Sequence, residues 1–268
     1  HRPEGDGDRR SLPLVLLFHG GGGNPWSCMR VTGFNRKADE AGFIAVYPAG
    51  TGPRRRQGLT WNAGRCCGPA QHEGVDDVGF IRTLVRHLKE TLPVDPERIY
   101  AAGISNGGMM CYRLACEMSG IFAAVGPVAG ALNLERCRPA RPVSVIAFHG
   151  TADLYVRYDG GRPRKRVLPG HDREDVSVAD SIGFWINHNG CRPEPAKETS
   201  GAVTRETYAG GRENSEVVLY TIRGGGHAWP GGAKGYQEGD EPTGEISATD
   251  LMWDFFSRHR RVYEDEPR

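Results

Sequence analysis

The sequence has almost no net charge, since its 34 Lys and Arg residues are balanced by 33 Asp and Glu residues. Proteins that bind nucleic acid or an anionic membrane surface usually carry a basic excess, so the composition favours neither partner. No apolar run approaches the ~20 residues that a membrane-spanning helix needs. The spacing of the seven cysteines fits no zinc-binding pattern. We therefore expect a protein with no nucleic-acid partner, no membrane span and no metal site.

No internal repeat, low-complexity tract or break in composition divides the 268 residues. This length suits one large α/β domain, so we expect a single domain over residues 1–268, with flexible ends at residues 1–10 and 260–268. Seven cysteines, two of them adjacent at Cys66 and Cys67, favour an oxidising compartment. An odd number leaves at least one thiol unpaired. We expect a secreted or periplasmic protein.

Apolar runs of the type found in buried strands alternate with segments of helical period. The predicted strands are 14–18, 43–47, 98–102, 122–125, 143–148, 203–208 and 216–222. The predicted helices are 32–41, 75–92, a segment after Ser105, 175–189 and 248–259. This alternation predicts a doubly wound, mostly parallel sheet with helices on both faces. The long irregular segment at 49–74 is expected to be ordered and functional.

The rest of the chain is organised around Ser105, which lies in the pattern Gly103-Ile104-Ser105-Asn106-Gly107. A strand-like run precedes it, and Met110, Leu114 and Met118 recur behind it at helical spacing. Small residues on both sides of a serine allow a sharp strand-to-helix turn that holds the hydroxyl clear of the sheet. The pattern alone is weak in a glycine-rich chain, but this context favours a nucleophile over a plain glycine turn.

Asp153 and His227 complete the chemistry that Ser105 needs. A serine hydroxyl is a poor nucleophile until an imidazole takes its proton, and the imidazole needs a carboxylate to orient it. Asp153 follows the predicted strand at 143–148, and His227 follows the last predicted strand. The chain order serine, aspartate, histidine is the order of α/β-hydrolase triads. We predict Ser105, Asp153 and His227 as the catalytic residues.

A glycine-rich loop at residues 20–23 follows the first predicted strand. It lacks the Gly-Lys-Ser/Thr ending of a P-loop, so binding of a phosphate is disfavoured, and a purely structural turn remains an alternative. We favour a loop that presents backbone N–H groups to a developing oxyanion. The expected donors are the amides of Gly21 and Asn106, and Gly22 is expected to contact substrate.

Two tryptophans, Trp61 and Trp229, have polar and glycine-rich neighbours in sequence. Core packing is the usual fate of a tryptophan, but such neighbours favour exposed rings at the rim of the site. An exposed indole offers a flat surface on which an aromatic acyl group can stack. We therefore predict that Trp61 and Trp229 bind substrate.

Five blocks of the sequence together resemble one family. They are WNAGRCCG at 61–68, VDDVGF at 75–80, GISNGGMM at 103–110, HGTAD at 149–153 and GGHAWPG at 225–231. In this order they resemble the secreted poly(3-hydroxybutyrate) depolymerases and feruloyl esterases of the α/β-hydrolase fold. The resemblance implies a carboxylic-ester hydrolase, usually exported, with no cofactor and with its triad on the three residues named above.

The resemblance also implies that Cys66 and Cys67 form disulfides, with Cys116 or Cys137 as partners. The chain departs from its relatives in two places. It has Val156-Arg157-Tyr158 where relatives often have Val-Pro-Tyr, and it lacks the second cysteine that many relatives carry downstream of the position of Cys191. Cys191 is therefore the expected unpaired thiol.

The predicted function is hydrolysis of esters by a serine esterase through an acyl-enzyme. Hydroxycinnamoyl (feruloyl) or similar aromatic esters are favoured because of the two tryptophans. Oligomers of 3-hydroxybutyrate or of an aromatic polyester are the alternative substrates. A non-catalytic binding protein of the hydrolase fold is disfavoured because all three triad positions are filled. A serine peptidase is a further alternative, which amide substrates would distinguish.

Overall fold

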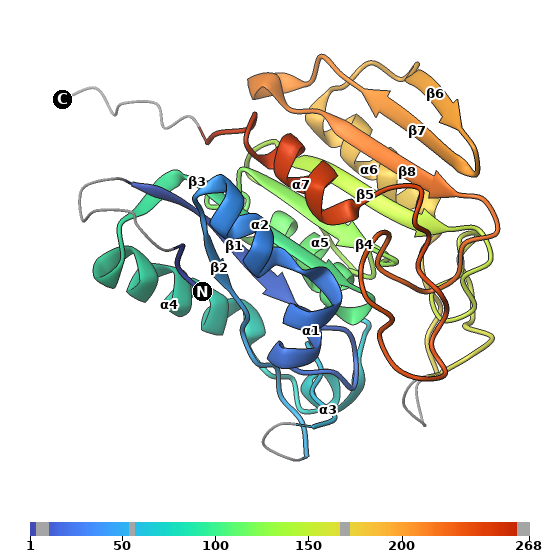
Figure 1. The fold of residues 1–268 in the computed structure, drawn as a ribbon, viewed down its shortest axis with the longest axis horizontal. Coiled ribbons are helices and arrows are strands. Elements are labelled where there is room, and N and C mark those ends of the chain that lie inside the picture. The colour runs from blue at the N-terminus through green and yellow to red at the C-terminus, as the bar shows by residue number, and fades with distance from the viewer. Residues whose placement is uncertain (4–10, 54–56, 167–171, 262–268) are drawn as a thin grey trace.

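The computed structural model describes residues 1–3, 11–53, 57–166 and 172–261. Its centre is a single eight-stranded sheet with the strand order β2-β1-β3-β4-β5-β8-β7-β6 (Figure 1). The strands are β1 (Leu12–Phe18), β2 (Ile44–Val46), β3 (Val94–Ile104), β4 (Ala124–Val128), β5 (Ser144–Gly150), β6 (Ala196–Ser200), β7 (Val203–Tyr208) and β8 (Val217–Ile222). Strands β2, β1, β3, β4, β5 and β8 pair in parallel, and β7 and β6 pair antiparallel at one edge. The predicted doubly wound, mostly parallel sheet is confirmed.

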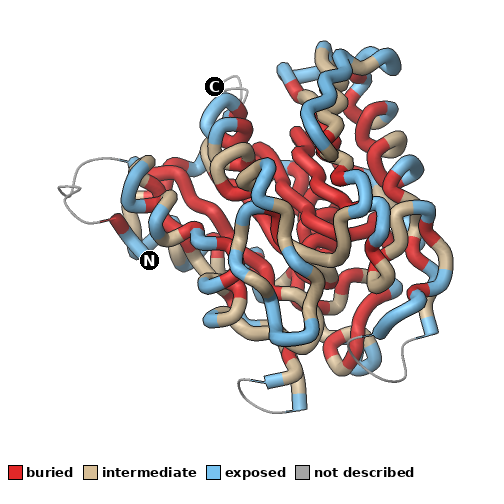
Figure 2. Tube along the Cα trace, turned by 45° about the vertical axis from the view of Figure 1, so that its right-hand side comes forward, coloured by how far each residue is buried: buried red, intermediate tan, exposed pale blue. Residues whose placement is uncertain are grey.

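Helices cover both faces of the sheet (Figure 1). One face carries α1 (Pro25–Thr32), α2 (Phe34–Ala41) and α7 (Ala248–Phe256), and the other carries α4 (Asp77–Thr91), α5 (Asn106–Glu117) and α6 (Val178–Asn189). Strand β1 shows why both faces are needed, because all seven of its residues are buried. Leu14, Leu16 and Phe18 belong to one hydrophobic layer, and Val15 and Leu17 belong to the other. The central strands are accordingly buried along their length (Figure 2).

The structure differs from the predicted elements where capping and turn residues override the spacing of apolar residues. The helix expected at 32–41 is two helices, because Gly33 adopts φ +65° and ends α1. Asn24 begins α1 by accepting a hydrogen bond from the Ser27 amide, a capping signal that the prediction missed. The prediction also missed strand β6, because all five of its residues are exposed and the strand shows no alternation of apolar and polar residues. The described residues of the segment at 49–74 are largely irregular, with the short helix α3 (Gly68–His72) near its end.

Parts of the expected flexible ends are held against the body of the protein. The amino terminus of His1 donates a hydrogen bond to the Ala45 carbonyl of β2, and the His1 carbonyl accepts one from the Ala45 amide. Arg261 is 3% exposed and donates to the Pro142 carbonyl. Residues 4–10 and 262–268 lie outside the described residues, and flexible ends remain a prediction.

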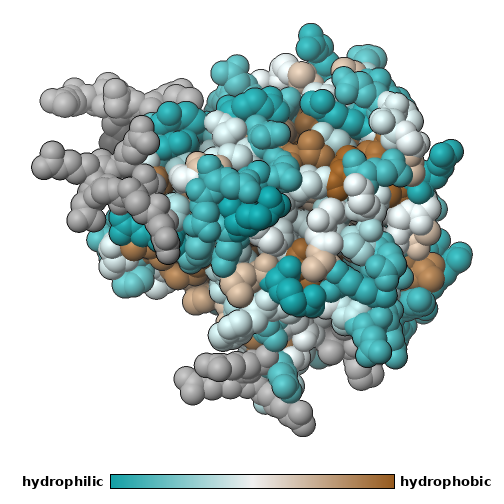
Figure 3. All heavy atoms as spheres, in the orientation of Figure 1, coloured by the Kyte–Doolittle hydropathy of each residue, from teal (hydrophilic) through white to brown (hydrophobic). Residues whose placement is uncertain are grey.

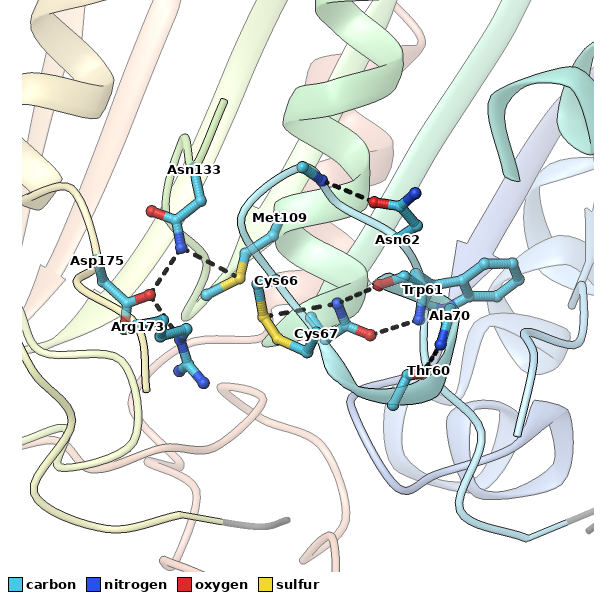
Figure 4. The surroundings of a disulfide bond; sticks show 12 residues. Thr60, Trp61, Asn62, Cys66, Cys67, Ala70, Met109, Asn133, Arg173 and Asp175 are labelled. Carbon is cyan, nitrogen blue, oxygen red and sulfur yellow. Dashed lines mark hydrogen bonds and ion pairs between the residues drawn. A yellow bond between two sulfur atoms is a disulfide. The ribbon is translucent and has the colours of Figure 1, made fainter. Parts of the chain in front are cut away.

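The cysteines pair differently from the expectation. Cys116 pairs with Cys137, and Cys66 pairs with its neighbour Cys67 (Figure 4). A bond from Cys66 or Cys67 to Cys116 or Cys137 is therefore wrong. Cys191 is unpaired as predicted, and so are Cys28 and Cys111, all three of them buried. Burial raises the pKa of each of these thiols, which keeps them in the unreactive protonated form.

Candidate active site

Four loops meet at one edge of the sheet. Because β1, β3, β5 and β8 run parallel, their carboxyl ends point the same way. The glycine loop follows β1, Ser105 follows β3, Asp153 follows β5 and His227 follows β8. In open α/β sheets, this is the edge at which ligands bind.

Ser105 lies in a strained turn between β3 and α5. Its φ of 60° and ψ of −124° fall in a region that non-glycine residues rarely adopt, at a typical cost of about 1–3 kcal/mol. The turn is possible only with glycine at its neighbours, since a Cβ on Gly107 would lie 2.2 Å from the Phe18 carbonyl oxygen. Among the residues that the structure describes, no hydrogen bond joins the Ser105 hydroxyl to His227. Such contacts often form only when substrate is bound.

Asp153 and His227 are brought together as predicted. The His227 Nδ1 lies 2.7 Å from one carboxylate oxygen of Asp153, Oδ2. The other oxygen, Oδ1, accepts hydrogen bonds from the amides of Tyr155 and Val156 at 2.8 and 2.9 Å. Burial of the Asp153 carboxyl would raise its pKa, but the attraction of His227 and these hydrogen bonds outweigh burial and lower it. Asp153 is therefore a buried carboxylate that two backbone amides hold through Oδ1 and that pairs with His227 through Oδ2.

The backbone of His227 is fixed by a residue that the sequence did not reveal. Asp240 accepts a hydrogen bond from the His227 amide at 2.7 Å, and a Cβ on Gly226 would lie 2.4 Å from the same carboxylate. Asp240 lies in the irregular segment between β8 and α7, where no hydrophobic period marks a position.

A second histidine, His149, faces Asp153 from the other side. Its Nε2 lies 3.5 Å from the Asp153 Oδ2 and 2.8 Å from the Val156 carbonyl oxygen, to which it donates. Burial lowers the pKa of His149, so the ring is neutral near pH 7. Both contacts are with the loop that carries Asp153, so His149 supports that loop.

The glycine loop lies directly against the serine turn. A Cβ on Gly20 would lie 3.4 Å from the Ser105 Cβ, and one on Gly21 would lie 3.7 Å from the Asn106 Cβ. The amides of Gly22 and Gly23 donate to the carbonyls of Leu59 and Gly20. The Gly21 amide has no acceptor in the described part of the chain, and Asn106 is the first residue of α5, where helical N–H groups lack partners. These two amides are available to an oxyanion, whereas the amide of Gly22 is used to hold the loop.

His19 holds the glycine loop in place. Its Nε2 accepts a hydrogen bond from the Gly50 amide at 3.1 Å, so its Nδ1 carries the proton and donates to the Gly20 carbonyl at 2.9 Å. Burial lowers the pKa of His19 to about 4, and the hydrogen bond to Gly20 opposes this only in part. The neutral ring is therefore part of the folded state at neutral pH.

This neutral histidine predicts a loss of stability in acid. Between pH 6.5 and about 4 the unfolded chain binds a proton at His19 that the folded chain does not, so the free energy of unfolding falls as pH decreases, by about 3 kcal/mol in total from this group. Urea unfolding at pH 7.0, 5.5 and 4.5 measures the slope. His19→Gln keeps one donor and one acceptor and should flatten the slope, whereas the exposed control His87→Gln should leave it unchanged. Equal slopes in wild type and His19→Gln would contradict this account.

The two tryptophans are not where the sequence placed them. Trp61 is 0% exposed and Trp229 is 1% exposed, so the expectation of indoles exposed at the rim of the site is wrong. The Trp61 indole packs against the Phe18 and His19 rings and donates to the His19 carbonyl. The Trp229 indole packs edge-on against Phe34 and donates to the Thr249 hydroxyl. Polar and glycine-rich neighbours indicated exposure, but a loop that folds back on the core buries its large apolar ring.

Trp61 serves the site through its backbone. The Asn106 side-chain oxygen accepts from the Trp61 amide at 2.7 Å, and its nitrogen donates to the Trp61 carbonyl at 2.9 Å. The pair of bonds fastens the 49–74 segment to the first turn of α5, beside the Cys66–Cys67 pair (Figure 4). The segment is therefore ordered where it carries Trp61, and there it supports the serine turn.

Metal binding finds no support in the described ranges, in which no group of three or more His, Cys, Asp or Glu side chains could hold an ion. No helix among those residues is long and apolar enough to cross a membrane. The face seen in Figure 3 is mostly hydrophilic, with hydrophobic residues in small separate patches.

The eight-stranded sheet, the strained serine after β3 and the carboxylate-histidine pair after β5 and β8 define an α/β-hydrolase fold. The family model described as "Esterase PHB depolymerase" matches residues 2–150, which is more than half of the chain. The chain belongs to this esterase family, as the five sequence blocks indicated.

Named relatives agree with this membership. The chain is 33% identical over 241 residues to feruloyl esterase B of Piromyces equi, covering 87% of this chain and 43% of that protein. It is 34% identical over 238 residues to the putative esterase NocK of Nocardia uniformis, covering 84% of this chain and 67% of that protein. It is 23% identical to poly(3-hydroxyalkanoate) depolymerase C of Paucimonas lemoignei, over 82% of this chain and 56% of that protein.

A solved structure supports the fold. Acetyl xylan esterase from Aspergillus awamori superposes with a TM-score of 0.62, covering 96% of this chain and 92% of that chain at 14% identity. At this identity the likeness concerns the fold alone, and it agrees with the α/β-hydrolase architecture described above.

Proposed function

We propose that this protein is a serine carboxylic-ester hydrolase that acts through Ser105, His227 and Asp153. One observation carries the proposal. A buried carboxylate held by two backbone amides lies 2.7 Å from the Nδ1 of His227, at the sheet edge where Ser105 follows β3 in a strained turn. A non-catalytic member of the fold would not need a histidine paired with a buried carboxylate beside the serine turn.

The mechanism follows from the assignment of the two imidazole nitrogens. Nδ1 carries the proton that it donates to Asp153, so Nε2 is free to accept the proton of the Ser105 hydroxyl. The Ser105 Oγ attacks the ester carbonyl carbon, and the amides of Gly21 and Asn106 stabilise the oxyanion. The Nε2 proton then passes to the leaving alcohol, which leaves an acyl group on Ser105. Water, deprotonated by His227, hydrolyses the acyl-enzyme and returns the serine.

Hydroxycinnamoyl or similar aromatic esters are the substrates that we propose first. The support is the relative named feruloyl esterase B, since the buried Trp61 and Trp229 no longer supply a stacking surface. Polyester oligomers are the second candidate, because a named relative is a poly(3-hydroxyalkanoate) depolymerase. Gly22 remains a proposed substrate contact, with its amide already donating to the Leu59 carbonyl. No cofactor enters any step of this mechanism.

A secreted or periplasmic location and a single domain complete the proposal. The Cys116–Cys137 and Cys66–Cys67 pairs support an oxidising compartment. One continuous sheet with two hydrophobic layers supports a single domain over the described residues.

The experiment that tests the proposed function compares kcat/KM on methyl ferulate, a 3-hydroxybutyrate oligomer and a terephthalate monoester, with a matched anilide of ferulic acid as the amide control. We expect ester hydrolysis with the highest kcat/KM on methyl ferulate. A preference for the aliphatic oligomer would reassign the substrate to polyesters. Hydrolysis of the anilide at a comparable rate would favour a peptidase, and no hydrolysis of any ester would overturn the proposal.

A further inference from the structure

A hollow of about 390 Å³ lies between α4 and the sheet, and a small molecule fits a space of this size. The α4 residues that line it follow helical spacing and so share one face of the helix. They are Arg82, Val85, Arg86, Lys89 and Glu90. Ile99 of β3 and Ile121, between α5 and β4, also line the hollow. Helix α4 and β3 lie side by side (Figure 1).

The hollow is separate from the candidate active site. Ile99 comes six residues before Ser105 along β3, which corresponds to roughly 20 Å at the rise of an extended strand. Ile121 comes just before β4, at the amino end of that strand, whereas the candidate catalytic residues all follow carboxyl ends. A ligand in the hollow would therefore not touch the triad.

The back of the hollow is apolar. Val85 and Ile99 belong to the hydrophobic layer beneath α4, and half-buried Ile121 packs against the same layer. The alkyl stems of the arginines and the lysine extend this apolar surface toward solvent. An apolar group that covers Ile121 and these stems is held by removal of that surface from water.

The rim of the hollow is cationic. The Arg82 guanidinium donates only to a neutral group, the Glu117 carbonyl, at 3.4 Å. Among the described residues, the side chains of Arg86 and Lys89 take part in no hydrogen bond or ion pair. Glu90 is the one acidic residue of the lining, so three positive charges against one negative charge leave an excess of two. Like charges at helical spacing repel each other, and a bound anion relieves that repulsion.

We propose that this hollow binds an organic carboxylate with an apolar body, of about the size of an aromatic acid. The carboxylate pairs with Arg86 and Lys89 at the rim, and the body covers Ile121 at the back. An inorganic anion would leave the apolar wall uncovered, and a neutral arene would leave the cations unpaired. The inference goes beyond the proposed function, because this binding needs no residue of the triad.

The test measures the dissociation constant of ferulate by isothermal titration calorimetry. The double variant Arg86→Ala/Lys89→Ala should weaken binding at least about tenfold, because it removes two charge-assisted contacts. Alanine is a strong helix former, so α4 should persist. The control Arg192→Ala/Lys197→Ala removes the same charge beside β6, at one edge of the sheet, and should bind ferulate as the wild type does.

Two further probes separate the halves of the ligand. Ferulamide keeps the ring and lacks the charge, and acetate keeps the charge and lacks the body. Each should bind wild-type protein at least about tenfold more weakly than ferulate. Raising the ionic strength should weaken ferulate binding, because salt screens the attraction of exposed charges.

An equal affinity for ferulate in the wild type and in the Arg86→Ala/Lys89→Ala variant would place its binding elsewhere and overturn the inference. Ferulamide or acetate that binds as tightly as ferulate would do the same, and so would a wild type that binds no ferulate. Both double variants should hydrolyse methyl ferulate with unchanged kcat/KM. A wild type that binds ferulate in this way but hydrolyses no ester would lose the proposed function alone.

Discussion

Ser105→Ala is expected to reduce kcat for ester hydrolysis on the order of 10⁶-fold, the loss that follows removal of the nucleophile from a serine triad. Alanine keeps the Cβ, so the turn between β3 and α5 retains its shape and its strain. The hydroxyl makes no hydrogen bond to another described residue, so its removal leaves no partner unpaired. The Asp153–His227 pair does not contact the Ser105 hydroxyl and should persist.

The measurement is kcat on methyl ferulate together with the melting temperature. Ser257→Ala is the matched control, since Ser257 is an exposed serine after α7 whose hydroxyl donates only to the Asp254 carbonyl. Ser105→Ala should melt within a few degrees of wild type while losing turnover, and Ser257→Ala should keep both. A Ser105→Ala protein with most of its esterase activity would refute the nucleophile assignment.

The parts of the site that could be predicted from the sequence are those marked by a local residue pattern. Ser105 has glycines on both sides and a helix behind it, and these features alone define a strand-turn-helix. Asp153 and His227 each follow a buried apolar strand, and parallel strands bring such positions to one edge of the sheet. The glycine loop could be placed at the same edge, because it directly follows β1, and the oxyanion role of the Gly21 amide stays a prediction.

The parts of the site that could not be predicted depend on how the irregular segments fold over the sheet. The burial of Trp61 and Trp229 is decided by contacts with Phe18, His19 and Phe34, which lie far away in sequence. Asp240 lies in a segment without hydrophobic period, so no pattern places it near His227.

Asp153→Asn is the second substitution with a large expected effect, because the structure dictates how the new amide must orient. The amides of Tyr155 and Val156 both donate to Oδ1, so the side-chain oxygen of the introduced asparagine would be held at that position. Its NH₂ group would then occupy the place of Oδ2, 2.7 Å from the His227 Nδ1. Nδ1 must become an acceptor, which moves the imidazole proton to Nε2.

An imidazole with its proton on Nε2 cannot accept the proton of Ser105, so kcat should fall about 10⁴-fold, with KM nearly unchanged. The structure adds a second cost, because the His149 Nε2–H lies 3.5 Å from Oδ2 and would face a donor. Kinetics on methyl ferulate at pH 7.5, with Asp159→Asn as an exposed control in the same loop, measure the effect. A loss of less than about tenfold would show that Asp153 does not set the proton position on His227, and that another acid orients it.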